Sequence, residues 1–277
     1  PKNSGGFRTI HAPSEAVKTT MRAMLAKLSY HLTMHDAAHA YIKKRTTVDA
    51  IKKHQSTEYT HFLRLDFHDF FGTCTEAFVK EQLQKLPLFA VQPEEDLDQF
   101  ISFCSLEGSL PQGTPLSPFL TNAIMIPIDA AISKFVHTHK GCYTRYADDI
   151  LISTTSANAC QHMKRGVLEA IAGTPLQLNH AKTRITSING KNFNLGLMLN
   201  KERNITVGNK AKELMRAKLS NFARHSATKG EAEELHGLLN YYLQIEPEYF
   251  QGLLTRYSRK YSMDILWSLR RRCAGPT

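Results

Sequence analysis

Cysteine is sparse in this sequence, and the cysteines that occur are scattered singly along the chain. There are five, at positions 74, 104, 142, 160 and 273. An odd number with no Cys-x-x-Cys pair supports neither a disulfide framework nor a zinc site, so we expect a reducing, cytoplasmic setting. The sequence also lacks an 18-residue apolar run and a secretory leader, so we predict neither membrane spanning nor secretion and expect no membrane partner.

Internal repeats and low-complexity linkers are also absent from the 277 residues. This length suits one large domain or two to three small ones, and a hydrophobic content of 42% supports a substantial core. The net charge is +10. Such an excess favours a polyanionic partner, nucleic acid before a membrane surface, with ordinary solubility charge as the alternative.

Two adjacent acids inside an apolar stretch are the most informative feature. Asp148 and Asp149 are flanked on both sides by apolar and β-branched residues within 142–153, which predicts a β-hairpin with both carboxylates at its tip. Neighbouring acids repel each other, and a hard divalent cation removes that repulsion. Asp66 ends a similar apolar strand. The alternatives are a solvated acidic turn and, for Asp66, a strand-end carboxylate that faces water.

These acids suit two-metal phosphoryl transfer, which requires carboxylates that hold two cations about 4 Å apart. Asp66 and Asp148 are the candidate bridging ligands of two Mg²⁺ ions. Asp149 either ligates a cation directly or supports the residues that do, and the Phe67 carbonyl offers another oxygen ligand. One ion would lower the pKa of a primer 3′-hydroxyl, and the other would stabilise the leaving pyrophosphate.

The hydrophobic pattern predicts an α+β fold, with antiparallel strands that carry the acids and long helices behind them. We expect helices over residues 14–32, with Ser14 as N-cap, and over 75–86, 94–104, 116–136 and 157–171. Besides the hairpin, strands are expected over 60–67, 183–188, 193–199 and 204–207, and the pattern is helical from residue 210 onward.

A Gly- and Pro-containing loop precedes the long apolar helix. Gly113 would let the backbone approach a ligand closely, and Ser117 is expected to cap the helix with Pro118 at its first position. A helix N-terminus attracts phosphate. A plain capped loop is the alternative, although Gln112 is harder to explain that way.

Taken in chain order, these motifs resemble those of the reverse transcriptases. The similarity lies in an acid in a strand followed by Phe70-Phe71, then Pro-Gln-Gly-x-Pro-x-Ser-Pro, then Tyr-Ala-Asp-Asp. Ala147 and the Ser-Pro of the loop resemble the bacterial retron and group II intron branch. Further segments that are similar to the family are Gly5-Gly-x-Arg8, His39-Ala-Tyr41 with Lys43-Lys44-Arg45, Leu178-Asn179-x-x-Lys182-Thr183, Leu195-Gly196-Leu197 and His236-Gly237. Five or more motifs in family order are specific, although each is soft alone.

The resemblance implies a right-hand polymerase. Its fingers would span residues 1–60, its palm 61–208 with an interleaved fingers segment near 75–112, and its helical thumb 209–277.

It also implies roles for single residues around the incoming nucleotide. Phe71 would exclude a ribose 2′-OH, while Phe70 packs in the core. Gln112 would lie near the sugar, with Gly113 at the phosphates. Lys182 would protonate the pyrophosphate, with a solvated surface lysine as the alternative.

The triphosphate and the nucleic acid would be held by basic and aromatic residues. Arg8 and one of Lys43, Lys44 or Arg45 would clamp the triphosphate; the sequence does not choose among the three, which are alternatively solvated or bound to template backbone. The expected nucleic-acid contacts are Tyr146, Leu195, Gly196 and Arg256.

Two segments depart from the retron pattern. Retron enzymes usually carry Val-Thr-Gly where this chain has Asn194-Leu195-Gly196, and an Asn-Ala-x-x-His box where it has Asp49-Ala50 followed by His54. Both segments are linked in that branch to recognition of its own structured RNA. The two departures leave the assignment to a polymerase better supported than the assignment to the retron subtype. Related defence reverse transcriptases share the core and differ in these segments.

The function expected from the resemblance is RNA-directed DNA synthesis on a dedicated non-coding RNA, in anti-phage defence. The implied partners are that RNA, the RNA–DNA hybrid, deoxynucleoside triphosphates and an effector or toxin protein. The alternatives are untemplated or protein-primed DNA synthesis by the same core, and an RNA-binding scaffold with incidental activity.

Overall fold

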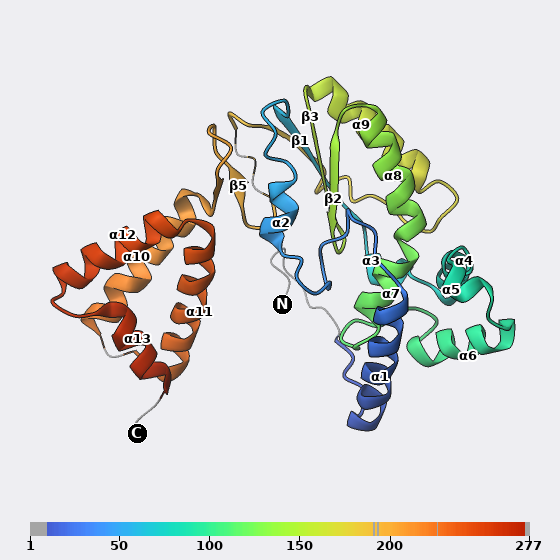
Figure 1. The fold of residues 1–277 in the computed structure, drawn as a ribbon, viewed down its shortest axis with the longest axis horizontal. Helices are drawn as coiled ribbons and strands as arrows, with labels where there is room; N and C mark the ends of the chain where they lie inside the picture. The colour runs from blue at the N-terminus through green and yellow to red at the C-terminus, as the bar shows by residue number, and fades with distance from the viewer. Residues whose placement is uncertain (1–9, 191, 193, 226, 275–277) are drawn as a thin grey trace. The chain divides into compact units, whose positions relative to one another are not determined.

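The computed structural model describes residues 10–190, 192, 194–225 and 227–274. The chain divides into two compact units, Pro1–Gly190 and Lys191–Thr277. Figure 1 shows the helices and strands of each unit. The predicted division into fingers, palm and thumb stays a prediction.

The first unit is built on a four-stranded antiparallel sheet with the order β2-β3-β1-β4. Its strands are β1 (His61–Asp66), β2 (Cys142–Tyr146), β3 (Asp149–Thr154) and β4 (Arg184–Ser187). Because side chains alternate between the faces of a strand, β1 sends Leu63 and Leu65 into the core. Arg64 and Asp66 therefore point to the opposite face.

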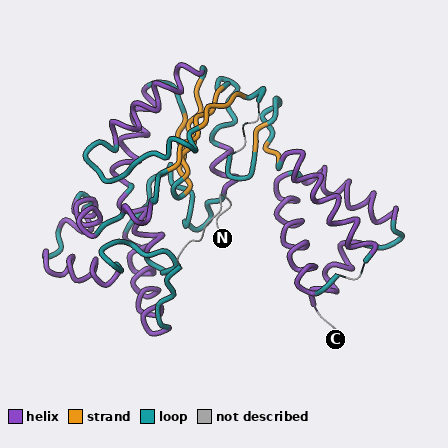
Figure 2. Tube along the Cα trace, turned by 180° about the vertical axis from the view of Figure 1, so that it is seen from behind, coloured by secondary structure: helices purple, strands orange, loops and turns teal. Residues whose placement is uncertain are grey.

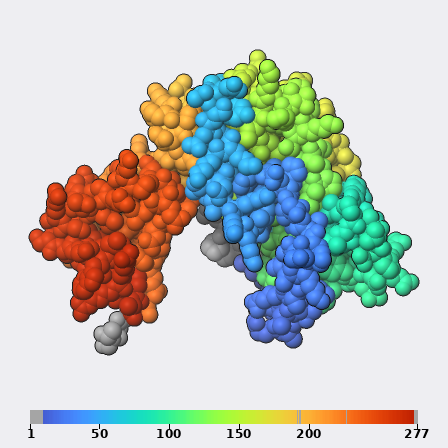
Figure 3. All heavy atoms as spheres, viewed as in Figure 1, coloured from blue at the N-terminus to red at the C-terminus, as the bar shows by residue number. Residues whose placement is uncertain are grey.

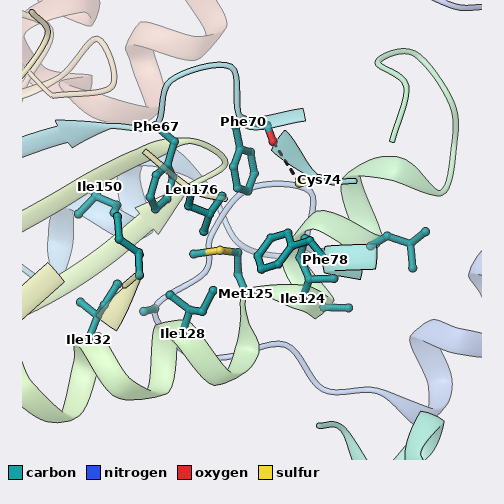
Figure 4. Close-up of a cluster of buried hydrophobic side chains, with 14 of the residues drawn as sticks. Phe67, Phe70, Cys74, Phe78, Ile124, Met125, Ile128, Ile132, Ile150 and Leu176 are labelled. Atoms are coloured by element: carbon teal, nitrogen blue, oxygen red, sulfur yellow. Dashed lines mark hydrogen bonds between the residues drawn. The ribbon is translucent and has the colours of Figure 1, made fainter. Parts of the chain in front are cut away.

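Two helices cover the apolar face of this sheet, α8 (Ile126–Thr138) and α9 (Ala157–Ala170). Figure 2 shows both helices beside the strands. Figure 4 shows the core beneath them, where Phe67 and Phe70 lie near Met125 and Ile128. The Phe67 and Phe70 rings stack with centroids 5.4 Å apart. Core residues thus lie on both sides of Asp66 in the chain, Leu65 before it and Phe67 after it.

The remaining helices of the first unit precede α8 in the chain. They are α1 (Glu15–His31), α2 (Thr47–Lys52), α3 (Phe70–Thr73), α4 (Glu76–Gln84), α5 (Pro87–Ala90), α6 (Glu94–Cys104) and α7 (Ser117–Ile124). The Ser14 side chain accepts a hydrogen bond from the Val17 amide, which confirms the predicted cap. In Figure 3 the atoms of α4 to α6 gather at one edge of this unit.

The long helix predicted over 116–136 is wrong in detail, because it consists of two helices. α7 ends at Ile124 and α8 begins at Ile126, with a bend of 47° between them. Pro127 explains the break, because it has no amide proton and its ring clashes with the carbonyl four residues earlier. The helix start also differs: the N-cap is Leu116, and the Ser117 hydroxyl instead pairs with that of Thr114 at 2.6 Å.

The second unit contains a small hairpin and four helices. Its elements are β5 (Met198–Leu199), β6 (Ile205–Thr206), α10 (Gly208–Arg224), α11 (Lys229–Ile245), α12 (Pro247–Lys260) and α13 (Ile265–Ala274). The Glu246 carboxylate joins the hairpin to the helices, because it accepts hydrogen bonds from the Thr206 hydroxyl at 2.8 Å and the Val207 amide at 2.9 Å.

Among the described residues, no single helix is both long and apolar enough to cross a membrane. The bent pair α7 and α8 reaches that length and composition only together, and its apolar residues, such as Leu120 and Ile132, are buried inside the first unit.

Candidate active site

The sheet brings the three predicted acids together at one end of β1 and β3. Asp66 and Asp149 are direct partners across the antiparallel ladder, a position in which side chains on one face meet. The Phe67 amide donates to the Asp148 carbonyl at 3.2 Å. Acids that are 82 residues apart in sequence therefore lie side by side.

Asp66 is paired with Lys182, which settles how each side chain is placed. Asp66 is only 4% exposed, and the Lys182 ammonium donates to its two carboxylate oxygens at 3.0 and 2.9 Å. The Asn179 amide bonds to the Asp66 carbonyl at 2.7 Å, which fixes the segment that carries Lys182. Asp66 is thus not a carboxylate that faces water, while Lys182 is an exposed lysine whose ammonium group is ion-paired with Asp66.

Asp149 has a cationic partner of its own. Arg64, two residues before Asp66 on the same face of β1, donates from Nε at 3.1 Å and from Nη2 at 2.8 Å to one oxygen of Asp149. The guanidinium thus occupies one of the two carboxylate oxygens of Asp149, and both direct ligation and a supporting role stay predictions for this residue.

Among the residues that the structure describes, no lysine, arginine or histidine forms an ion pair with the third acid, Asp148. Burial raises the pKa of its carboxyl group, and the nearby charges of Asp149 and Asp66 raise it further, while Lys182 opposes them. Folding thus makes the negative charge of Asp148 less favourable than it is in water, and a bound cation would oppose this effect.

The donor set fits a hard divalent cation, although no ready-made cage is present. Among the residues that the structure describes, no group of three or more His, Cys, Asp or Glu side chains is arranged to hold a metal ion. The carboxylates of Asp66 and Asp148 and the Phe67 carbonyl are oxygen donors of the kind that Mg²⁺ prefers. Lys182 sits where positive charge is needed, so a cation would compete with its ammonium group for Asp66.

The hairpin tip is held from beneath by a buried cation. Arg145 is fully buried, and its guanidinium forms an ion pair with Asp129 of α8 at 2.7 Å. Burial opposes the charge of Arg145, but the Asp129 carboxylate outweighs it and the pKa of Arg145 is raised. Ala147 in the tip has a φ of 57°, in the left-handed region that few non-glycine residues adopt.

The two adjacent phenylalanines take different positions. Phe70 is 4% exposed and belongs to the core, as predicted. Phe71 is half-buried, and its ring meets that of Phe70 edge to face at 5.9 Å. The ring of Phe71 is thus braced by the aromatic stack that follows Asp66.

The Pro-Gln-Gly loop closes against a neighbouring segment of chain. The His11 amide donates to the Gln112 carbonyl at 2.8 Å. Gly113 has a φ of 106°, and a Cβ there would lie 2.5 Å from the Ile10 side chain and 2.7 Å from the His11 carbonyl. Gly113 is therefore required by the approach of residues 10–11, whatever ligand the loop binds.

The structure separates the three basic residues of the 43–45 segment. Arg45 is used internally, because its Nη1 donates to the His35 carbonyl at 2.8 Å and to the Ala38 carbonyl at 2.6 Å. Lys43 and Lys44 are exposed. The two lysines thus remain as candidates for the triphosphate clamp, while Arg8 lies outside the described residues.

The predicted nucleic-acid contacts are divided between the two units. Tyr146 pairs with Asp149 at the end of β2 in the first unit. In the second unit, Leu195 and Gly196 both have positive φ and form a two-residue turn closed by hydrogen bonds between Asn194 and Leu197, as a type I′ hairpin requires. Arg256 is exposed on α12.

Asp49 and His54, which depart from the retron box, both have internal partners. Asp49 forms a capping box with Thr46 at the start of α2. His54 is fully buried and bonds to the hydroxyls of Ser153 at 2.7 Å and Thr144 at 2.8 Å, and burial lowers its pKa to about 3. His54 therefore fastens α2 to the sheet as a neutral side chain.

Four polar residues that support the site were missed by sequence reasoning: Arg64, Asn122, Asp129 and Arg145. A signal for two of them was present in the sequence, since Asp129 is an isolated acid in an apolar helix and Arg145 an isolated base in an apolar strand. A buried charge requires a partner, and these two partner each other.

Acids at the ends of antiparallel strands, with helices behind the sheet, define the class of the protein as a polymerase palm. A family model described as "Reverse transcriptase (RNA-dependent DNA polymerase)" matches residues 1–223. The chain therefore belongs to the reverse transcriptase family and is an RNA-directed DNA polymerase.

Curated relatives confirm the resemblance to the retron branch. The retron Ec83 reverse transcriptase of Escherichia coli is 28% identical over 99% of this chain and 89% of its own length. The retron Ec73 enzyme of the same organism is 27% identical over 96% of this chain and 86% of its own. The retron Mx65 reverse transcriptase of Myxococcus xanthus is 28% identical over 92% and 62%, respectively.

Solved structures agree on the right-hand polymerase fold. Apo telomerase from Candida tropicalis superposes with a TM-score of 0.51 at 12% identity, covering 93% of this chain and 54% of that one. Telomerase from Candida albicans with a fragment of telomeric RNA gives 0.50 at 13% identity, covering 88% and 47%. The chain spans about half the length of these telomerases, and the likeness concerns the fold alone.

Proposed function

We propose that this polymerase copies a dedicated non-coding RNA into DNA by two-metal nucleotidyl transfer, in the cytoplasm and in anti-phage defence. The observation that carries the chemistry is the pairing of Asp66 with Asp149 beside Asp148. The relatives are named retron reverse transcriptases, which supports the copying of RNA into DNA, while the dedicated template and the defence role are inferred from the resemblance to that branch. An effector or toxin protein is the further partner that this role implies.

In this proposal each acid has one task. Asp66 and Asp148, with the Phe67 carbonyl, would hold two Mg²⁺ ions, and Asp149 would be oriented by Arg64. When bound, the ions supply positive charge to the 3′-hydroxyl and to the leaving pyrophosphate. Lys182 would release Asp66 and donate a proton to the pyrophosphate.

The nucleic acid would be held mainly through its backbone. The net charge of +10 suits an RNA–DNA hybrid, and affinity carried by phosphate contacts falls steeply with salt. Tyr146, Leu195, Gly196 and Arg256 are the proposed contacts, while Gln112, Gly113 and Lys44 would meet the incoming nucleotide.

The proposal is tested by sequencing the nucleic acid that copurifies with the chain from its host. We expect one abundant RNA and DNA complementary to part of it. Repetitive DNA without a matching RNA would instead indicate untemplated synthesis, and RNA without DNA would indicate a scaffold.

Replacing Phe71 by Ala is expected to admit ribonucleotides. Removing the ring opens space for a 2′-hydroxyl, so preference for deoxynucleotides should fall by about 10- to 100-fold. A competition assay with paired dNTP and rNTP substrates measures the ratio. Phe103→Ala, which removes an exposed ring on α6, is the matched control, and selectivity equal to that control would refute the gate.

Replacing Lys182 by Ala is expected to slow chemistry by about 100-fold at unchanged dNTP affinity, the usual size of a general-acid effect. Pre-steady-state incorporation measures both quantities. Lys85→Ala, which removes an exposed lysine that is ion-paired with Glu81, serves as the control. A defect confined to nucleotide binding would count against the proton-donor role.

A further inference from the structure

The guanidinium of Arg145 is bonded on every side inside the first unit. Nε and Nη2 donate to the two oxygens of Asp129 at 2.9 and 2.7 Å. Nη1 donates to the Asn122 side chain and to the Ala147 carbonyl, both at 3.0 Å. Tyr143 adds a hydrogen bond to Asp129 at 2.6 Å. Such a bidentate pair fixes the orientation of the guanidinium and also neutralises its charge.

The bond to Ala147 acts on the catalytic turn. Ala147 precedes Asp148, and its left-handed φ of 57° is a conformation that alanine does not adopt without support. The Arg145 side chain supplies that support from beneath the turn. The direction in which Asp148 leaves the hairpin thus depends on a guanidinium that is itself held by α8.

The same residue binds a second segment of chain, residues 37–40. The Arg145 amide donates to the Ala37 carbonyl at 2.7 Å, and the His39 amide donates to the Arg145 carbonyl at 2.9 Å. Asn122, the Nη1 partner, donates from its side chain to the Ala40 carbonyl at 2.8 Å. These contacts tie residues 37–40 to the backbone and the side chain of one strand residue.

Residues 37–40 lead directly into the exposed pair Lys43 and Lys44. Arg45 closes this segment on itself through the His35 and Ala38 carbonyls. Residues 37–45 therefore form one loop that is held by internal hydrogen bonds and that carries two exposed lysines. The loop is attached to Arg145, the residue that also supports the turn before Asp148.

We propose that Arg145 is a positioning residue for nucleotide addition, which sets the Asp148 turn and the 37–45 loop in one fixed relation. The inference rests on the proposed function, in which the turn acts at the reacting phosphate and the loop lysines bind the rest of the triphosphate. Asn122 transmits the position of Arg145 to the loop, and Asp129 holds Arg145 in place.

Two substitutions separate the two connections. Asn122→Ala removes the bond to Ala40 and the bond from Arg145 Nη1, but keeps the Asp129 pair and the bond to Ala147. The KM for dNTP should therefore rise about tenfold with kcat within about twofold, the size of one lost buried hydrogen bond. Arg145→Lys keeps the charge but loses the fork, so kcat should fall about 100-fold, as small misplacements of reacting groups do.

Ser153→Ala is the control for a purely structural effect. Ser153 shares one buried hydrogen bond with His54 in the same sheet, and among the described residues its side chain forms no hydrogen bond with the turn or with the loop. Its kcat and KM per folded molecule should equal those of the unmodified chain, whatever its loss in Tm.

Hydrogen exchange supplies a readout that does not depend on activity. In Arg145→Lys, amides of both residues 37–45 and residues 146–149 should exchange faster than in Ser153→Ala. If the unmodified chain copies RNA while both site variants keep its kcat, KM and exchange rates, the positioning role is overturned. If the unmodified chain copies no RNA, the proposed function fails, and the exchange result still decides whether Arg145 couples the two segments.

Discussion

Asp148→Asn is expected to abolish Mg²⁺-dependent primer extension on RNA while RNA affinity stays nearly unchanged. Asn keeps the volume of Asp148 and removes the charge that a cation requires. A residual rate of about one thousandth or less would correspond to roughly 4 kcal/mol of lost transition-state stabilisation. Single-turnover extension and filter binding on the same preparation measure the two quantities.

The same substitution should not destabilise the protein. Burial and the neighbouring acids raise the pKa of Asp148, so its negative charge is less favourable in the folded than in the unfolded chain, and the neutral amide removes this difference. The Tm should therefore be equal or higher. Asp96→Asn, at an exposed acid in the first turn of α6, makes the same chemical change away from the site. Full extension activity in Asp148→Asn, or equal loss in Asp96→Asn, would remove the metal assignment.

Asp129→Ala is expected to lower the free energy of unfolding by about 3–5 kcal/mol, because it leaves the Arg145 guanidinium buried without a counter-charge. In a chain of this size the Tm should fall by about 10 °C. Thermal unfolding followed by far-UV circular dichroism measures the shift. A loss below about 1 kcal/mol would show that Arg145 finds other partners or water.

A double variant separates stability from positioning. Asp129→Leu combined with Arg145→Met replaces the pair by apolar side chains of similar volume, a change that is often neutral for stability. The double variant should regain most of the Tm that Asp129→Ala loses. Its primer extension should remain impaired, because neither side chain can hold the Ala147 carbonyl.

The clustering of the three candidate acids could be predicted because its signal is local. An apolar strand that ends in an acid, and two acids between apolar runs, are readable from alternation alone, and the sheet register places them together. The break between α7 and α8 was also readable, since Pro127 lies inside the helical pattern. The prediction of one continuous helix over 116–136 gave more weight to the long apolar run than to this proline.

The supporting residues could not be predicted, because each depends on a partner from another element. Nothing near Arg64 in the sequence indicates that it neutralises Asp149. Arg45 points into its own loop because the backbone carbonyls of residues 35 and 38 accept its hydrogen bonds. No side-chain pattern in the sequence reveals these acceptors. The sequence therefore could not separate Arg45 from the exposed Lys43 and Lys44. Helix α2 was overlooked because it is only six residues long and has too few turns for a clear periodicity.

The position of β1 at the interior of the sheet has a consequence for biosynthesis. His61 pairs with Thr154 on one side and with Ser187 on the other, so β1 leaves the ribosome long before either neighbour exists. Until then the apolar side chains of β1 have no partner strand, and long-range strand pairing is slow, which exposes the chain to aggregation. Both hydrogen-bonded neighbours of the strand that carries Asp66 are thus present only after β4 has been translated. A chain whose translation stops before β4 would lack part of the sheet that holds the three acids together.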